Sequence, residues 1–284
     1  MYDFYFGSKD KIKSDEKAFL LGIKRNLPRW CNGIPDSEFL AIADILDGME
    51  LEGRNPVFLE TGTGASTLVL IHYALKYDGM LFSWDFNGSK GAFLRGVITD
   101  TLLNYHRKNI FNHWTFVAYN STSEHLGISI LKEMGKQVCF CFFDSDHTLD
   151  VLIREVELSN EVLVDGGVIA IDDANYTYRH LNYAYLNMFR TKLGLSTFKN
   201  TPDNTCEPFY IEVERFLKER WNRVEYLNDS YKRNYKTDIF WNYYGLDREV
   251  LSSIEESMEK TADLEHRFDA WKVWQRRETM GEIY

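Results

Sequence analysis

The chain has 284 residues, and its 44% hydrophobic and 15% aromatic content is enough to build a sizeable buried core. Acidic residues number 43 and basic residues 33, which gives a formal net charge of −10. This balance disfavours a nucleic-acid partner, because phosphate backbones are bound by clustered cations. No apolar run approaches the ~18 residues that a membrane span needs, so we expect no membrane contact.

Cysteine usage and the start of the chain bear on the cellular compartment. The first residues contain no basic region followed by an apolar stretch, so no secretory signal is predicted. The chain's four cysteines form no CxxC motif and are too few for a disulfide scaffold. A reducing compartment fits this usage, and we predict a cytoplasmic protein.

The first 50 residues are typical of helices. Apolar side chains recur near helical spacing around residues 19–27 and again around 39–46. The polar residues before the second of these stretches include Asp and Ser, which can begin a helix. We therefore expect an N-terminal helical cap over residues 1–50.

From residue 56 short apolar runs alternate with longer amphipathic stretches. The five runs cover residues 57–60, 80–85, 114–119, 138–144 and 167–172. Helices are expected between them, near 66–77, 89–108, 121–134 and 147–163. Strands that are apolar on both faces and separated by helices indicate a parallel sheet covered on both sides. The predicted fold is therefore α/β, with a Rossmann-like, doubly wound sheet.

The part of the chain after residue 206 is expected to complete this sheet. A helix from Phe209 to Trp221 is followed by two β-like runs, 223–227 and 237–244. Because a short polar segment joins these runs, they predict an antiparallel edge pair on a mostly parallel sheet of seven strands. The sheet domain then spans residues 51–245.

The tail from residue 246 to about 275 has the spacing of an amphipathic helix, so we expect a C-terminal helical extension over residues 246–284. Its apolar face is expected to pack against its own domain more often than against a second copy of the chain. A homo-oligomer formed through the terminal helices is the alternative.

Four of the five apolar runs end in a carboxylate. These residues are Glu60, Asp85, Asp144 and Asp172. Ligands of open α/β sheets bind beyond the carboxyl ends of the strands, so the four acids should converge at one edge. That edge is the candidate functional site.

A motif with two glycines follows the first apolar run and opens a helix. Its characteristic positions are Glu60, Gly62, Gly64 and Ser66. Glycines let the backbone turn sharply and approach a ligand closely. A nicotinamide dinucleotide site favours a third glycine where this chain has Thr67, and the preceding acid repels phosphate but suits an ammonium or sulfonium group. The alternative is a plain strand-to-helix turn.

Two polar residues follow the next two runs. Asp85 ends the second run, where a carboxylate can accept hydrogen bonds from both hydroxyls of a ribose, and a helix cap is the alternative. Ser121 lies just past the third run, where it can cap a helix or contact a base. Together with the glycine motif, Asp85 favours a ligand that contains a nucleoside.

Acidic residues gather after the fourth and fifth runs. Asp144 and Asp172 end successive strands, and Asp173 lies beside Asp172. Asp146 and Asn175 are further candidates nearby. Two carboxylates ~4 Å apart repel by about 4 kcal/mol at an effective dielectric of roughly 20, so such a cluster favours a bound cation. Oxygen ligands without a nearby thiolate favour Mg²⁺, Mn²⁺ or Ca²⁺. The alternative is that the paired acids only cap a turn.

One histidine opens the helix after the acidic loop. His147 has the side chain that serves most often as a general base. Nearby carboxylates raise the pKa of an imidazole, whereas a helix N-terminus and a bound cation lower it. A structural role is the alternative, but the position beside the acids favours a functional one.

The arrangement resembles the class I S-adenosylmethionine-dependent methyltransferases over about residues 55–245. The segment from 60 to 66 is similar to their first motif, and Asp85 to their ribose-binding acid. An Asp144-x-x-His147 strand end followed by a pair of acids after the next strand resembles the metal-dependent O-methyltransferases of macrolide sugars and the related cephalosporin-tailoring proteins. By this resemblance Asp144, Asp172 and Asp173 match the Mg²⁺ ligands, and His147 matches the base.

The expected function is therefore O-methyl transfer from S-adenosylmethionine to a hydroxyl of a small molecule, such as a sugar or another natural product. The predicted donor-binding residues are Glu60, Gly62, Gly64, Ser66, Asp85, Ser121 and Asp144. The N-terminal helices and the loop near 175–190 are expected to cover the acceptor. Two alternatives are an NAD-dependent oxidoreductase on a similar sheet and a non-catalytic assembly protein with the methyltransferase fold.

Overall fold

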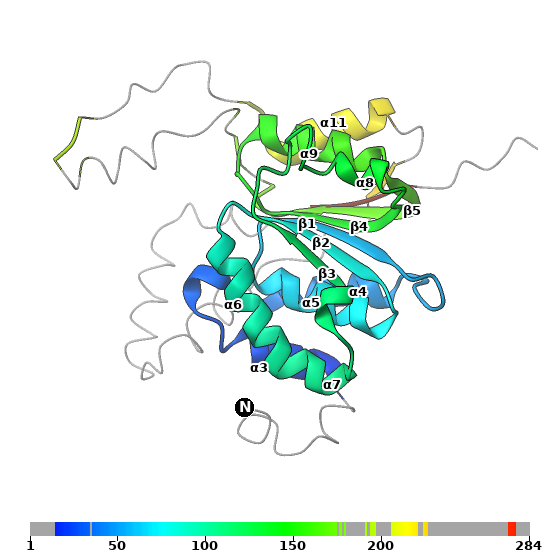
Figure 1. Cartoon of the computed structure of the whole chain (residues 1–284). Helices are drawn as coiled ribbons and strands as arrows, with labels where there is room; N and C mark the ends of the chain where they lie inside the picture. The colour runs from blue at the N-terminus through cyan, green and yellow to red at the C-terminus, as the bar shows by residue number, and fades with distance from the viewer. Residues whose placement is uncertain are drawn as a thin grey trace, which may run out of the picture.

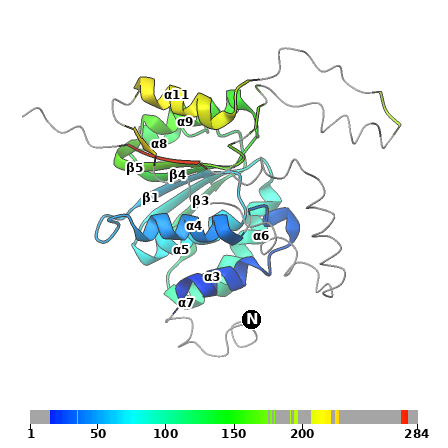
Figure 2. The same cartoon turned by 180° about the vertical axis from the view of Figure 1, so that it is seen from behind.

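The computed structural model has an α/β fold in which helices cover both faces of one sheet (Figures 1 and 2). It describes residues 15–34, 36–174, 176–177, 179, 191, 194–196, 206–220, 224–226 and 272–276. Among these residues no helix has both the length and the apolar character needed to cross a bilayer.

The sheet is mostly parallel with an antiparallel edge pair, as the sequence predicts. Its strands are β1 (Val57–Thr61), β2 (Met80–Trp84), β3 (Trp114–Val117), β4 (Val138–Phe143), β5 (Leu163–Ile171), β6 (Val224–Tyr226) and β7 (Lys272–Arg276). They lie in the order β3-β2-β1-β4-β5-β7-β6. The first five are parallel to one another, and β7 runs antiparallel to both β5 and β6. The strand order reverses beside β1, where ligands of such sheets bind.

The strands alternate their apolar side chains between two cores. Phe58 and Phe140 pack into the core on one face, and Leu59 and Cys141 into the core on the other. Because both faces are buried, each strand reads as a continuous apolar run.

The helices divide between the two faces (Figure 1). One side carries α3 (Glu16–Lys24), α4 (Asp36–Asp47), α5 (Ala65–Lys76), α6 (Gly88–Ile98) and α7 (Asn104–His106). The other side carries α8 (Ile130–Glu133), α9 (Leu149–Asn160) and α11 (Phe209–Arg220). Three irregular turns join them: η1 (Arg29–Cys31), η2 (Thr99–Leu103) and η3 (Ile110–Asn112).

The two N-terminal helices pack against α5. Lys24 of α3 is buried and donates a 2.7 Å hydrogen bond to Asp36 of α4, which joins the two helices. Tyr73 of α5 donates to Asp47, and Lys76 donates to Glu16. The predicted N-terminal helices are thus present and continue the core over the sheet.

Two predictions about the end of the chain are corrected. The strand that pairs with β6 is β7, formed by Lys272–Arg276. The tail is therefore not helical as far as residue 275. The predicted strand 237–244 and residues 246–271 of the predicted helix lie outside the described residues. A strand position supplied from far along the chain has no local signal, and tertiary pairing overrides the helical spacing. The predicted helix over 121–134 is also much shorter, since α8 covers only its last turn.

Candidate functional site

The turn between β1 and α5, called here the glycine loop (Gly62, Thr63 and Gly64), is in contact with the end of β4. Gly62 has a φ of +79°, and a Cβ added there would lie 1.7 Å from the carbonyl oxygen of Asp144. A side chain therefore cannot fit at Gly62 without moving the backbone. A Cβ at Gly64 would lie 3.1 Å from the carbonyl oxygen of Cys31, so η1 borders the loop on another side.

Glu60 lies beneath this loop, fully buried. Its carboxyl group accepts hydrogen bonds from the hydroxyls of Ser66, Thr67 and Ser83, at 3.0, 2.8 and 2.6 Å. Burial raises the pKa of Glu60 to about 7, against the opposing effect of these hydroxyls. The structure thus places Glu60 and Ser66 inside the fold, where they hold the loop.

The residue that departs from the dinucleotide motif has a structural task. The hydroxyl of Thr67 accepts a hydrogen bond from the backbone N–H of Gly64 at 3.1 Å and donates one to the carboxyl group of Glu60. This satisfies one of the free N–H groups at the start of α5. A glycine at this position would lose both bonds.

Asp85 lies at the end of β2, and the chain's own donors surround it. One carboxylate oxygen accepts from the amide and the hydroxyl of Thr63, both at 2.9 Å, and lies 3.2 Å from Nζ of Lys90. The other accepts from the amide of Asn87 at 2.7 Å. The side chain is 10% exposed. Ribose hydroxyls would therefore have to share this carboxylate with Thr63 and Lys90, two residues that the sequence did not indicate.

Three predicted residues form a second group, called here the acid–histidine cluster: Asp144, His147 and Asp173. One ligand atom of each lies within 4.8 Å of the others. Nδ1 of His147 is 3.0 Å from Asp173, and Nε2 is 3.9 Å from Asp144. Since Gly62 packs on Asp144, the cluster adjoins the glycine loop.

Asp172 is not among the residues whose ligand atoms lie together in this cluster. Its Oδ1 accepts the backbone N–H of Asp173 at 2.7 Å. Asp173 has a φ of +49°, a left-handed conformation that is uncommon for a residue other than glycine. Sequence adjacency alone could not show this turn. Asp146 is also outside the cluster, and Asn175 lies outside the described residues.

The surroundings of His147 favour its charged form. Burial lowers the pKa of the imidazole. The hydrogen bond to Asp173 and the negative charges of Asp172 and Asp146 raise this pKa by more than burial lowers it, so the net shift is upward. The side chain remains 45% exposed. The ring of Tyr176 lies 5.5 Å from that of His147 and packs in turn on Phe209 of α11. No motif in the sequence indicated Tyr176.

Ser121 is buried, and its hydroxyl donates to Glu155 of α9. The same carboxyl group accepts from Ser145 at 2.8 Å and from Thr61 at 3.1 Å. Burial raises the pKa of Glu155 to about 7. The hydroxyl of Ser121 is thus used inside the fold, and a contact between Ser121 and a base stays a prediction.

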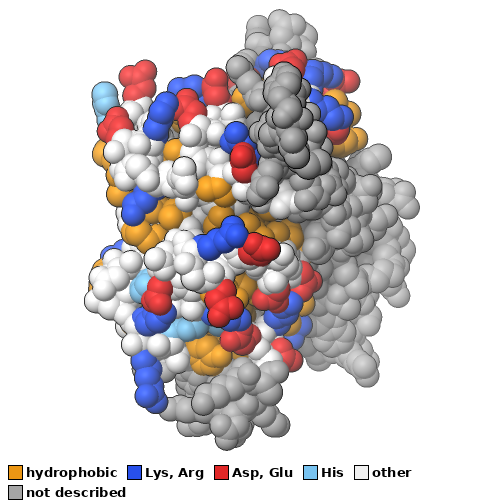
Figure 3. Space-filling view, turned by 90° about the vertical axis from the view of Figure 1, so that its right-hand side faces the viewer, with side chains coloured by type: hydrophobic (Ala, Val, Ile, Leu, Met, Phe, Trp, Pro, Cys, Tyr) orange, Lys and Arg blue, Asp and Glu red, His pale blue; other side chains and the backbone are white. Residues whose placement is uncertain are grey.

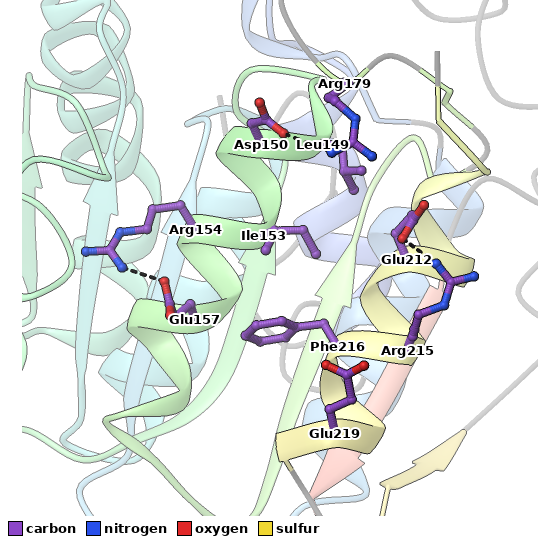
Figure 4. Close-up of a pocket in the computed structure, with 10 residues that line it drawn as sticks. All are labelled: Leu149, Asp150, Ile153, Arg154, Glu157, Arg179, Glu212, Arg215, Phe216 and Glu219. Carbon is purple, nitrogen blue, oxygen red and sulfur yellow. Dashed lines mark hydrogen bonds and ion pairs between the residues drawn. The ribbon is translucent and has the colours of Figure 1, made fainter. Parts of the chain in front are cut away.

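Two cavities are lined by other residues. One, of about 440 Å³, lies between α9 and α11 (Figure 4), where Arg154 pairs with Glu157 and Arg215 pairs with Glu212. Another, of about 890 Å³, lies near the amino ends of the strands, beside Pro56. Neither is lined by residues of the glycine loop or the acid–histidine cluster. On the face shown in Figure 3, acidic and basic side chains of the described residues are interspersed.

Comparisons with known proteins give one family. A family model described as a methyltransferase domain matches residues 59–174, from β1 to the turn after β5. The search of curated proteins finds no significant match.

Solved structures give several distant neighbours. CalS11, a TDP-rhamnose 3′-O-methyltransferase of calicheamicin biosynthesis, is 17% identical with a TM-score of 0.39, over 69% of this chain and 92% of that one. An O-methyltransferase from Bacillus cereus in complex with SAH is 14% identical with a TM-score of 0.41, over 80% and 91%. The MccD protein is 11% identical with a TM-score of 0.47, over 86% and 100%. At these identities the neighbours do not assign a function.

The assignment rests on the matched segment and what it contains. Residues 59–174 carry the glycine loop, Asp85 and all three members of the acid–histidine cluster, on a parallel sheet whose order reverses beside β1. Over these residues the chain therefore matches a methyltransferase domain.

Proposed function

We propose that the chain is an O-methyltransferase that uses S-adenosylmethionine to methylate a hydroxyl of a small molecule, a sugar or a glycosylated natural product. The contact between Gly62 and Asp144 carries this proposal. Because these backbones touch, a donor bound along the glycine loop would place its methyl group beside the acid–histidine cluster. The acceptor class comes from the resemblance of the Asp144-x-x-His147 segment to sugar O-methyltransferases.

Donor binding is assigned to the outer side of the glycine loop. Gly62 and Gly64 allow close approach of the donor, and Asp85 accepts from its ribose hydroxyls. Glu60 and Ser66 support the loop from below. The positive charge of the sulfonium suits an edge that carries several carboxylates.

His147 is proposed as the general base, and Asp173 orients it. If Nδ1 carries the proton and donates a hydrogen bond to Asp173, Nε2 has the free lone pair that accepts a proton from the acceptor hydroxyl. The acceptor oxygen then forms a bond to the methyl carbon while the carbon–sulfur bond breaks. The proton ends on Nε2, and S-adenosylhomocysteine leaves as a neutral thioether.

A divalent cation fits the cluster. Asp144 and Asp173 offer carboxylate oxygens close to the imidazole, a donor set that suits Mg²⁺ or Mn²⁺. We propose these two carboxylates as ligands from this chain, without Asp172. When bound, the cation supplies positive charge that lowers the pKa of the acceptor hydroxyl.

Calorimetric titration with S-adenosylhomocysteine, followed by a methyl-transfer assay, tests this function. The chain should bind S-adenosylhomocysteine, and a panel of sugars and glycosylated natural products should yield products heavier by one methyl group in mass spectrometry. EDTA should suppress this turnover, and Mg²⁺ should restore it. Binding without transfer to any hydroxyl, together with transfer to a nitrogen or carbon acceptor, would contradict the proposal.

A further inference from the structure

Glu155 lies under the strand ends that form the candidate site. It is fully buried in α9, on the apolar side of that helix with Leu152 and Val156. A buried carboxyl group is costly unless hydrogen bonds satisfy it, so its partners indicate why it is there.

The partners of Glu155 come from three different strand ends. Thr61 is the last residue of β1 and precedes Gly62. Ser145 follows Asp144 after β4, and Ser121 lies in the loop after β3. One side chain thus joins the end of β1 before the glycine loop, the residue after Asp144 of the acid–histidine cluster, and the loop after β3.

The backbone adds a fixed frame around this carboxyl group. The amide of Asp144 donates to the carbonyl of Thr61 at 2.9 Å, and the amide of Ile128 donates to the carbonyl of Ser121 at 2.7 Å. These bonds hold the loops at their bases, whereas Glu155 holds the side chains beyond them. A group that bonds to several loops at once restricts their relative movement more than separate pairs would.

We propose that Glu155 is a positioning residue that fixes the glycine loop and the acid–histidine cluster relative to each other, through Thr61 on one side and Ser145 on the other. It contacts neither donor nor acceptor. This inference depends on the proposed function only in the choice of S-adenosylhomocysteine as the probe.

Two substitutions at Glu155 separate positioning from simple stability. Glu155→Met keeps the length of the side chain but removes all acceptors, so binding of S-adenosylhomocysteine should weaken roughly tenfold and the imidazole signals of His147 should shift in NMR spectra. Glu155→Gln keeps one acceptor oxygen and should restore most of both properties. Leu152→Ala, on the same helix face, is the matched control that lowers the melting temperature without touching the three hydroxyls.

Two further variants separate the effect of Glu155 on the glycine loop from its effect on the acid–histidine cluster. Thr61→Val should weaken binding of S-adenosylhomocysteine by roughly fivefold and leave the His147 signals in place. Ser145→Ala should shift the His147 signals and leave this affinity within about twofold. All titrations are carried out well below the melting temperature of each variant.

The outcomes are distinguishable. A wild-type chain that does not bind S-adenosylhomocysteine contradicts the proposed function. If the wild type binds, and Glu155→Met changes affinity and His147 signals no more than Leu152→Ala does, Glu155 is only a stabilising residue and the inference is wrong. The inference is equally wrong if Glu155→Gln is as damaged as Glu155→Met, or if Thr61→Val and Ser145→Ala show no division. If Glu155→Met does not fold, the Gln, Val and Ala variants decide.

Discussion

The glycine loop and the acid–histidine cluster lie at the same edge of the sheet, but they use their acids differently. Beside the loop, Glu60 and Asp85 accept from hydroxyls, backbone amides and one lysine. In the cluster, Asp144 and Asp173 flank an imidazole. The first arrangement stabilises a backbone conformation, whereas the second places a titratable imidazole between two carboxylates, one near each ring nitrogen. Acids at strand ends therefore divide into those that organise a site and those that face its chemistry.

The largest expected effect tests the chemical side of this comparison. His147→Ala should lower kcat by ~10²–10⁴-fold, because the proposed base is lost, while the affinity for S-adenosylhomocysteine stays close to that of the wild type. Steady-state kinetics and calorimetry measure the two quantities. His113→Ala, at the amino end of β3, is the control that should keep normal turnover. A His147→Ala variant that turns over at the wild-type rate would make the histidine structural.

The ion-binding side of the cluster gives the next effect. Asp144→Asn should lower turnover by about 10²-fold and make the remainder insensitive to EDTA, because one proposed ligand is lost. Asp146→Asn is the matched control, since Asp146 is two residues away but outside the cluster. An equal loss of turnover in both variants would mean that the total negative charge of the loop, and not a defined cation site, determines the rate.

On the glycine-loop side, Asp85 and Lys90 should act in opposite directions. Asp85→Asn should weaken binding of S-adenosylhomocysteine by roughly tenfold, because a charged acceptor for the ribose is lost. Lys90→Met should tighten it modestly, because the cation 3.2 Å from Asp85 no longer competes. Calorimetry on both variants measures the sign. If Lys90→Met weakens binding, the lysine contributes to the donor site instead of competing for it.

The smallest expected effect concerns stability and its dependence on pH. The pKa of Glu60 is raised from 4.5 to about 7 in the folded chain, so the folded state binds the proton more tightly than the unfolded state does. The Glu60 contribution to the free energy of unfolding therefore falls as pH rises from about 5 to 8, by roughly 1–3 kcal/mol. Urea unfolding at both pH values should show a smaller decrease for Glu60→Gln than for the wild type. Equal decreases would mean that Glu60 is ionised in the fold throughout this range.

Sequence patterns anticipated the edge of the sheet better than the details within it. The strand that contains Glu60 and those that precede Asp85 and Asp144 are local apolar runs, so their ends could be located, and parallel pairing then brings the ends together. Burial on both faces made the runs continuous and easy to recognise. The glycine loop followed because two glycines directly after a strand indicate a tight turn.

Other features depend on contacts that no local pattern contains. The partner of β6 comes from Lys272–Arg276, far along the chain. The left-handed turn at Asp173 and the composition of the acid–histidine cluster likewise have no local signal. The sequence gives one sign of Glu155: an acid three residues after Leu152, on the apolar side of a helix. Such an acid is normally expected at the border between the apolar and polar faces, so its buried partners could not be predicted.

The central claim is that the glycine loop and the acid–histidine cluster form one site. Its most direct test is the NMR signal of the His147 imidazole in the wild-type chain, recorded while S-adenosylhomocysteine is added, with His113 at the opposite edge as the internal reference. We expect the His147 signals to shift in proportion to the bound fraction and those of His113 to stay in place. Saturating binding by calorimetry without any change at His147 would contradict it.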